Sequence, residues 1–504
     1  MIMSLPEAFI EDLKPYLPAE ELEEFVRALS QTDASVCVRI NRNKGGDEIH
    51  WTQNDESNGE FQNVETIAES QIPWSIEGKY LSERPLFTLD PQLHGGAYYV
   101  QEASSQFVTH VLRSLLPADQ PVTMLDLCAA PGGKSTAALS VLPEGSVLVS
   151  NEIDHRRARI LSENVTKWGN ANVIVTGNAP RDFSPLSHLF DVVLTDVPCS
   201  GEGMFRKDEG AISDWSPAKV EGCVKLQREI LQDIWPTLKP GGLLIYGTCT
   251  FNVHEDEEQL RYICDELGAT PVEIPVEGAW HIHPALKDTL PCYRFMPHYT
   301  RGEGLFMAAL RKNEDEPLQT IRNVEARHNK KGGKPENNSK ARSFDNKGKG
   351  GNVKLQKPAI DMKRLSAELQ SWVRCEGIVE STSDGTLRLI PKELQNLNSL
   401  LSAHGLYMLQ SGIELGIIKG KDVIPSHALA MSIERNEEAF PMVEVNRETA
   451  LSYLRREAIV LPTDAPTGYV LVCYKRLPLG FVKNMGNRSN NLYPQEWRIR
   501  MQEK

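Results

Sequence analysis

Strand-like and helix-like segments alternate regularly between residues 122 and 311 of the chain. Short apolar runs that end in polar residues or glycine are followed by longer segments whose apolar residues recur every three or four positions. The expected strands are 122–128, 147–153, 173–177, 190–197, 242–248 and 304–311, and the expected helices are 134–141, 155–168, 217–238 and 254–267. This alternation predicts an α/β fold built on a parallel, doubly wound sheet with helices on both faces.

The remaining sequence indicates further domains, since 504 residues are too many for one hydrophobic core. The expected division is 1–92 as a small α+β module that binds RNA, 93–314 as the α/β domain, 315–357 as a basic low-complexity linker, and 358–504 as a C-terminal region with a compact β-rich module at about 440–502. Apolar alternation supports a strand at Val36–Ile40 in the first module and strands at 469–474, 479–483 and 491–494 in the last.

The net charge of −13 is unevenly distributed. Ten Lys/Arg residues against two Asp/Glu give Arg327–Lys357 a local charge of +8, which leaves −21 for the rest of the chain. Basic segments on an acidic body are typical of RNA-binding enzymes, although a solvated linker would have the same composition. Nine cysteines without close pairs, no membrane-length apolar run and no signal-peptide pattern indicate a cytoplasmic protein with reduced thiols and no metal site.

The first expected strand of the α/β domain ends in a glycine turn that opens a helix. The turn comprises Cys128, Ala129, Ala130, Pro131, Gly132, Gly133 and Lys134. Its glycines allow a ligand to approach the backbone, and the free N–H groups of the following helix suit the carboxylate of a cofactor such as S-adenosylmethionine. Glu152 ends the next expected strand, where an acid can accept hydrogen bonds from ribose hydroxyls. The alternative is a plain tight turn beside a surface carboxylate.

Two cysteines directly follow two other expected strands. Cys199 lies in the segment Asp196-Val-Pro-Cys-Ser-Gly201, and Cys249 lies in Thr248-Cys-Thr250. Ligands of open α/β sheets bind at the carboxyl ends of strands, so both thiols and the glycine turn should face one cleft. Methylation of carbon 5 of cytosine requires such a set, because a thiolate must add to carbon 6 and a carboxyl group such as Asp196 must stabilise the ring.

These residues resemble the RNA 5-cytosine methyltransferases of the NOL1/NOP2/Sun family, and within it the bacterial rRNA enzymes. The matching segments are 99–105, the glycine turn, 196–208 and 247–251, and the resemblance covers about 90–312. It implies a Rossmann-like methyltransferase domain and a C-terminal PUA-like RNA-binding module. It also implies that Cys249 is the nucleophile, that Cys199 assists release of the product, and that Cys128–Lys134, Glu152 and Asp196 line the S-adenosylmethionine site, with Asp196 also facing the base.

Two positions depart from the family pattern. Val197 replaces the usual alanine, a small apolar change that we expect to be tolerated. Asn178 stands where the family usually has an acid near the adenine, and its carbonyl oxygen could accept a hydrogen bond from the adenine amino group. We therefore include Asn178 in the expected cofactor site.

The resemblance leaves several alternatives open. Small-subunit rRNA is the substrate that it implies, but tRNA remains possible, and a non-catalytic ribosome-assembly factor would retain the same cleft. The segment Glu163-Asn-Val165 mimics a motif of DNA cytosine methyltransferases, but it precedes the Pro-Cys strand and belongs to an amphipathic helix. We therefore expect a monomer that binds RNA and neither DNA nor a membrane.

Three further groups of residues remain to be interpreted. Arg206 and Lys207 could hold RNA phosphates or simply be solvated. The acids at 255–258 are expected to complement the dipole of a helix that begins there. Tyr493, Trp497 and Arg498 could stack on bases, but aromatic residues of a small β module more often fill its core.

Overall fold

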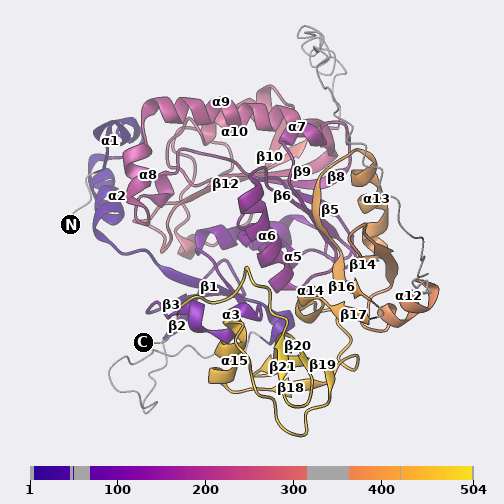
Figure 1. Ribbon diagram of the computed structural model, residues 1–504. Helices are drawn as coiled ribbons and strands as arrows, with labels where there is room; N and C mark the ends of the chain where they lie inside the picture. Colours follow the sequence, from indigo (N-terminus) through magenta and orange to yellow (C-terminus); the bar gives the residue numbers. More distant parts are fainter. Residues whose placement is uncertain (1–4, 46–48, 50–67, 315–361, 421, 502–504) are drawn as a thin grey trace, which may run out of the picture.

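The computed structural model describes residues 5–45, 49, 68–314, 362–420 and 422–501 (Figure 1). The expected linker at 315–357 lies outside the described residues, so its structure stays a prediction. Four β-sheets are present in the described parts of the chain. No helix in these parts has the length and the apolar character that crossing a bilayer requires.

The central sheet has nine strands in the order β10-β12-β9-β8-β5-β6-β7-β15, with β11 paired to β12. Five of them run parallel, namely β5 (Thr123–Asp126), β6 (Val147–Asn151), β7 (Val173–Thr176), β8 (Phe190–Asp196) and β9 (Leu238–Thr248). The sequence predicted all five within a few residues at each end. Their order along the sheet reverses between β5 and β8, and such a switch point is where ligands of this architecture bind.

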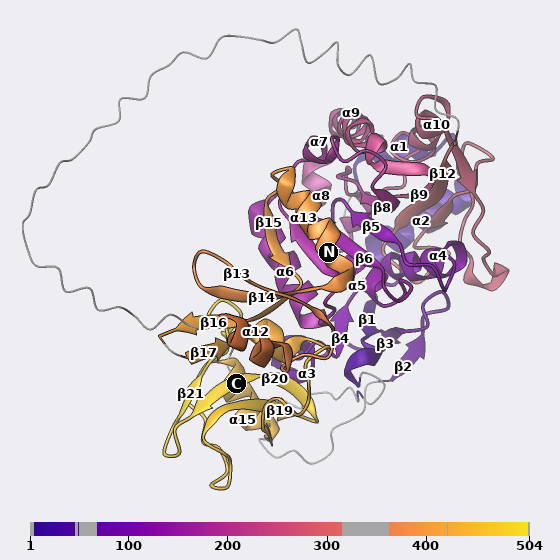
Figure 2. The same ribbon diagram turned by 90° about the vertical axis from the view of Figure 1, so that its right-hand side faces the viewer.

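Helices cover both faces of the central sheet (Figures 1 and 2). One face packs against α4 (Phe107–Leu115), α5 (Gly133–Leu139) and α6 (His155–Trp168). The other packs against α7 (Pro180–Phe183), α9 (Pro217–Ile234), α10 (Glu257–Asp265) and α13 (Gln395–Ala403). The strands are therefore buried on both sides, which explains their nearly continuous runs of Val, Ile and Leu.

The sixth expected strand does not run parallel to the others. β12 (Leu305–Lys312) is antiparallel to β9, and β10 (Ala269–Val272), which the sequence did not predict, is antiparallel to β12. The connection between β10 and β12 contains β11 (Tyr293–Phe295), which itself pairs with β12. Because that connection stays at the edge where β10 ends, β12 must return in the opposite direction. The prediction of a wholly parallel sheet is therefore wrong for this strand.

The N-terminal region packs closely against the α/β domain. α1 (Glu7–Leu13) and α2 (Ala19–Gln31) share a buried cluster with Phe205, Trp215 and Phe251 of that domain. A four-stranded sheet follows, formed by β1 (Val36–Ile40), β2 (Glu69–Gln71), β3 (Gly78–Leu81) and β4 (Tyr98–Val100). This sheet continues past the boundary expected at residue 92, because β4 is its last strand.

The chain after residue 361 forms two small sheets and also returns to the central one. β13 (Gly377–Ser381), β14 (Thr386–Pro391), β16 (Ile413–Lys419) and β17 (Asp422–Pro425) make the first sheet, and β18 (Met442–Glu444), β19 (Gly468–Tyr474), β20 (Leu477–Asn484) and β21 (Ser489–Asn491) make the second. Between β14 and β16, α13 covers one face of the central sheet, and β15 (Met408–Ser411) adds an antiparallel edge strand to β7. Figure 2 shows this segment lying against the α/β domain.

Candidate active site

The two cysteines singled out by the sequence lie side by side. Cys199 follows β8 and Cys249 follows β9, and because these strands are parallel neighbours, both turns leave the same edge of the sheet. The Cys199 and Cys249 Sγ atoms are 3.3 Å apart, within hydrogen-bonding distance for thiols. Both side chains are partly exposed, so a substrate can reach them. We call Cys199, Cys249, Lys134 and Asp196 the thiol site.

A lysine from the glycine turn completes the thiol site. The Lys134 ammonium donates a hydrogen bond of 2.8 Å to the Asp196 carboxylate across the switch point between β5 and β8. Burial opposes the charge on Lys134, but the Asp196 carboxylate and the nearby Cys249 outweigh it and raise the pKa of this lysine. The positive charge of Lys134 therefore lies close to Cys249.

The environments of the two thiols differ. The hydrogen bond to Cys249, together with burial, raises the pKa of the Cys199 thiol well above its usual value. Cys199 therefore keeps its proton, and its sulfur shares a hydrogen bond with the sulfur of Cys249. These surroundings suit Cys199 to the thiol form.

Two buried glutamates hold the turns on which the thiols lie. Glu202, in the chain that follows Cys199, accepts hydrogen bonds from the Phe251 and Asn252 N–H groups just after Cys249, at 2.6 and 3.1 Å. Glu255, which follows Cys249, accepts a hydrogen bond of 3.0 Å from the Ser200 N–H group beside Cys199. The Asn252 side chain donates to both glutamates, at 2.8 and 2.9 Å. Each turn thus fixes the other, so the two thiols are held at a constant separation.

A buried ion pair reinforces the turn that carries Cys249. The hydroxyls of Thr248 and Thr250, on either side of this cysteine, donate to the Asp256 carboxylate at 2.6 and 3.1 Å. Asp256 in turn lies 3.0 Å from the guanidinium of the fully buried Arg294, which also pairs with Glu257. The acids at 255–257 are therefore buried braces, and Glu257 and Glu258 lie in the first turn of α10, so the structural role expected for these acids is confirmed.

The expected cofactor residues lie around the switch point. Gly132 adopts the left-handed conformation, with φ of 110°, at the start of α5. Arg157 and Asn164, both on α6, fix the glycine turn by donating to the carbonyls of Ala130 and Pro131, each at 2.8 Å. The turn is thus shaped before any ligand arrives.

Two acids flank the glycine turn. Glu152 is buried after β6 and lies 3.1 Å from the Arg157 guanidinium. Asp126 is the last residue of β5, and burial raises its pKa to about 7. One Asp126 oxygen accepts a hydrogen bond of 2.6 Å from Ser135, while the other is buried without a partner among the described residues. A ligand with an amino group and a ribose fits these acids, as S-adenosylmethionine does. Asp126 was not among the expected site residues, although its place two residues before the turn could have revealed it.

Asn178 makes contacts that the sequence did not predict. Its side-chain oxygen accepts a hydrogen bond of 2.9 Å from the Tyr407 N–H group, and its side-chain nitrogen donates one of 3.0 Å to the Tyr407 carbonyl. Asn178 therefore ties the start of β15 to the end of β7. Only the second lone pair of its oxygen remains for an adenine, so its place in the cofactor site stays a prediction.

Several other sequence candidates have structural roles. Arg206 is buried and pairs with Glu303 at 2.9 Å, so the interpretation that it binds RNA phosphates is wrong. Lys207 is exposed, as a phosphate contact requires. Tyr493 and Trp497 pack in the core around β19 and β20, as expected. The segment Glu163-Asn-Val165 lies on α6, where Leu161, Val165 and Trp168 are buried, but Ile160 on the same expected face is half-exposed.

Three family models match successive parts of the chain. They are described as the N-terminal domain of 16S rRNA methyltransferase RsmF at residues 5–103, 16S rRNA methyltransferase RsmB/F at residues 113–311, and the methyltransferase RsmF PUA domain at residues 440–499. The chain belongs to the RsmF family of 16S rRNA methyltransferases. It is an enzyme that transfers a methyl group from S-adenosylmethionine to a cytosine of rRNA.

Relatives match this methyltransferase over nearly its full length. Ribosomal RNA small subunit methyltransferase F from Erwinia tasmaniensis is 28% identical over 97% of the chain and 96% of its own length, and the protein of the same name from Serratia proteamaculans is 27% identical over 98% and 96%. A crystal structure of NSun6 from Pyrococcus horikoshii with SFG aligns with a TM-score of 0.50 at 18% identity, and covers 62% of this chain and 100% of that one. This last likeness concerns the fold.

Proposed function

We propose that the methyltransferase modifies carbon 5 of its cytosine through a covalent adduct with Cys249. The observation that carries this proposal is the pairing of the two thiols at 3.3 Å beside the Lys134–Asp196 ion pair. Addition of the Cys249 thiolate to carbon 6 makes carbon 5 nucleophilic. S-adenosylmethionine, when bound, supplies the electrophilic methyl group. The carbon 5 proton is then lost to solvent, which reaches the site, and its two bonding electrons re-form the ring double bond as the carbon–sulfur bond breaks and the Cys249 thiolate leaves.

We assign product release to Cys199 and ring stabilisation to Asp196. The Cys199 sulfur lies 3.3 Å from the Cys249 sulfur, so in the adduct the Cys199 thiol would lie beside the carbon–sulfur bond that must break. Asp196 is about one-third exposed at the end of β8, and its carboxylate can face the base while Lys134 holds it in place. These assignments agree with the protonated state that its surroundings give to Cys199.

The cofactor would be held by the glycine turn Cys128–Lys134, by Glu152 and by Asp196, with Asn178 at the adenine end. Support comes from the shape of the turn, from the unpartnered oxygen of Asp126 and from the crystallisation of the Pyrococcus horikoshii protein with SFG, an analogue of S-adenosylmethionine. Asp126 joins this set because an ammonium group would satisfy its free oxygen.

The substrate that we propose is small-subunit rRNA, as the names of the relatives state for those proteins. The N-terminal module and the PUA domain would hold structured RNA while the target base swings out of its stack into the thiol site. The enzyme would act as a monomer in the cytoplasm, without binding DNA or a membrane. The sequence alone left open transfer to tRNA and a purely structural role in ribosome assembly, and the experiment below includes both as outcomes.

The first experiment is methyl transfer from labelled S-adenosylmethionine to small subunits, free 16S rRNA and tRNA from cells that lack this chain. We expect 5-methylcytosine, identified by nuclease digestion and mass spectrometry, in one small-subunit RNA. Label in tRNA alone would change the substrate, and no transfer with intact cofactor binding would favour the assembly role.

Two variants test the thiol assignments in the same assay. Cys249→Ala should lower methyl transfer by about 10³-fold or more while it retains cofactor binding. Cys199→Ala should accumulate a covalent protein–RNA adduct, visible as a slow band on a denaturing gel, because addition proceeds and release stalls. An adduct in Cys249→Ala would mean that the two roles are exchanged.

A further inference from the structure

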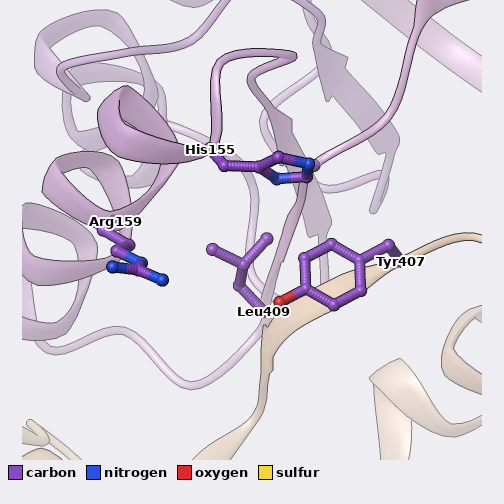
Figure 3. Close-up of a pocket in the computed structure, with 5 residues that line it drawn as sticks. His155, Arg159, Tyr407 and Leu409 are labelled. Carbon is purple, nitrogen blue, oxygen red and sulfur yellow. The ribbon is translucent and has the colours of Figure 1, made fainter.

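A cavity of about 570 Å³ opens on the sheet edge that carries the thiol site, but three to five strands away. His155, Arg159, Gly177, Tyr407 and Leu409 line it (Figure 3), and we call it the β15 pocket. Gly177 follows β7 and Tyr407 precedes β15, while the thiols follow β8 and β9. Four strand spacings of about 4.8 Å put the pocket roughly 20 Å from the thiols. No residue of the glycine turn lines this pocket, nor does Glu152 or Asp196.

Tyr407 offers an aromatic ring that is open to solvent on a backbone that hydrogen bonds hold in place. The Gly177 N–H group and the side-chain amide of Asn178 donate to the Tyr407 carbonyl, both at 3.0 Å. The Tyr407 N–H group donates to the side-chain oxygen of Asn178 at 2.9 Å. The side chain is nevertheless 57% exposed, and its ring meets the His155 ring edge-on at 5.7 Å. A planar ligand could therefore stack on Tyr407 at little cost in conformational entropy.

Arg159 adds a positive charge beside this aromatic surface. It lies on α6 and points toward Leu409 and the pocket (Figure 3). Within the described parts of the chain, Arg159 forms neither an ion pair nor a hydrogen bond with another residue, in contrast to Arg157 two residues before it. An unpaired guanidinium next to an open aromatic ring suits a phosphate joined to a flat base.

The floor of the pocket is open because residue 177 is glycine. A Cβ atom at Gly177 would lie 3.1 Å from Tyr407 and Leu409 and 3.3 Å from His155, tighter than ordinary contact. The backbone of Gly177 has no positive φ, so conformational freedom does not explain the glycine. The missing side chain instead leaves space between α6 and β15.

We propose that the β15 pocket binds one unpaired nucleobase of the RNA substrate, with the base on Tyr407 and an adjoining phosphate on Arg159. The inference rests on the proposed function, since it makes the pocket a second contact for the strand whose cytosine reaches the thiol site. The pocket and the thiols share one edge, so a short single-stranded segment can reach both. Stacking selects an unpaired base, and the pocket therefore favours RNA that is locally single-stranded.

The test measures RNA affinity and cofactor affinity separately, using the full chain and small-subunit rRNA as the probe. Tyr407→Ala should weaken RNA binding by roughly 5- to 100-fold, the range typical of a lost base–aromatic stack, while Tyr407→Phe should retain it. Arg159→Gln should weaken binding and make its salt dependence shallower, by about 0.7 in the logarithmic slope for one phosphate. Lys225→Gln removes the same charge from the exposed surface of α9, on the other face of the sheet. It should change neither the RNA affinity nor its salt dependence.

The same variants distinguish the other possible outcomes. The Kd for S-adenosylmethionine should change by less than about twofold in each variant, and the unfolding midpoint should stay constant because Tyr407 is exposed. Weaker cofactor binding with unchanged RNA binding would show that the pocket holds the adenine of the cofactor instead, and no change in either affinity would also overturn the proposal. RNA affinity is also measured in the Cys249→Ala background, where binding does not depend on methyl transfer. A failure of methyl transfer would therefore contradict the proposed function, but it would leave the binding test of the β15 pocket decisive.

Discussion

The thiol site and the β15 pocket lie on the same edge of the central sheet, but they are built in opposite ways. At the thiol site, residues only 50 positions apart meet on adjacent parallel strands, and buried carboxylates and an arginine fix their turns. At the β15 pocket, contacts join residues 229 positions apart, and the side chains that line it are open to solvent. The first end is rigid and polar inside, whereas the second is a surface assembled from distant parts of the chain.

This difference separates what each end can do. A thiol must approach one carbon atom closely, so a shift of even a fraction of an ångström at the thiol site would impair the reaction. An exposed ring with a free guanidinium tolerates movement and suits recognition of a flexible strand. Substitutions at the thiol site should therefore reduce stability and turnover, and substitutions around the β15 pocket should mainly reduce affinity and local order.

The largest expected effect is that of Arg294→Met. It leaves Asp256 and Glu257 buried without a cation, which should cost about 3–5 kcal/mol of unfolding free energy and loosen the turn at Cys249. Chemical denaturation measures this change. Arg261→Met, which breaks the ion pair with Asp288 on the exposed side of α10, is the matched control and should have little effect. Equal losses in both variants would show that the buried network does not stabilise the thiol site.

The second expected effect concerns turnover. Lys134→Met removes the positive charge beside Cys249 and Asp196, and methyl transfer should fall by about 10²-fold in kcat, as for loss of one preorganised electrostatic group. Single-turnover kinetics at saturating cofactor and RNA measure the chemical step. Lys239→Met breaks a similar pair with Asp191 at the opposite ends of β8 and β9, and kcat should be unchanged. If Lys134→Met raised only the cofactor Kd, the lysine would serve binding alone.

The sequence allowed much of the thiol site to be predicted because its residues directly follow apolar strands. The end of a buried parallel strand fixes where Cys199, Cys249 and Glu152 must lie. Periodicity reports local burial, however, and does not reveal the partner from elsewhere in the chain. Arg206 therefore looked like a solvent-facing cation, although Glu303, 97 positions away, holds it inside.

The β15 pocket was not predicted from the sequence, for the same reason. The strand β15 has only four residues, and nothing in its own sequence shows that it extends a sheet more than two hundred residues earlier. Asn178 was assigned to the cofactor because it stands where the resembling family usually has an acid near the adenine, while its contact with Tyr407 depends on the late strand β15. Long-range pairing of short edge strands is thus the part of the fold that local patterns do not predict.

A third, smaller effect tests the hydrogen bonds between Asn178 and Tyr407. Asn178→Ala removes two hydrogen bonds to Tyr407 and should destabilise the docking of β15 by about 1–2 kcal/mol. Hydrogen exchange of residues 407–411 should become faster, while exchange in β8 and β9 stays unchanged. A large rise in cofactor Kd without faster exchange would instead support the predicted contact with adenine.

The smallest expected effect is on stability and concerns His254, which joins α1 to α10. Its ring nitrogens lie 3.2 Å from Asp12 and 3.1 Å from Glu258, and the hydrogen bond to Asp12, followed by that to Glu258, raises the pKa of His254 to about 9. Because the pKa in the folded state exceeds the unfolded value, this contribution is complete below about pH 6.5 and is lost as pH rises through 9. Solvent reaches the ring, so the contribution should not exceed about 1 kcal/mol.

His254→Gln isolates this contribution. The unfolding midpoint of the wild type should fall more between pH 6.5 and 9.5 than that of the variant, and the two should converge at the alkaline end. Lys287 also pairs with Glu258, so Lys287→Gln serves as the control that alters the same carboxylate without removing the titrating ring. If wild type and His254→Gln lost stability equally across this range, the link between α1 and α10 would not depend on a charged histidine. The polar contacts that stabilise the thiol site would then be limited to the buried ones made by Arg294 and the glutamates.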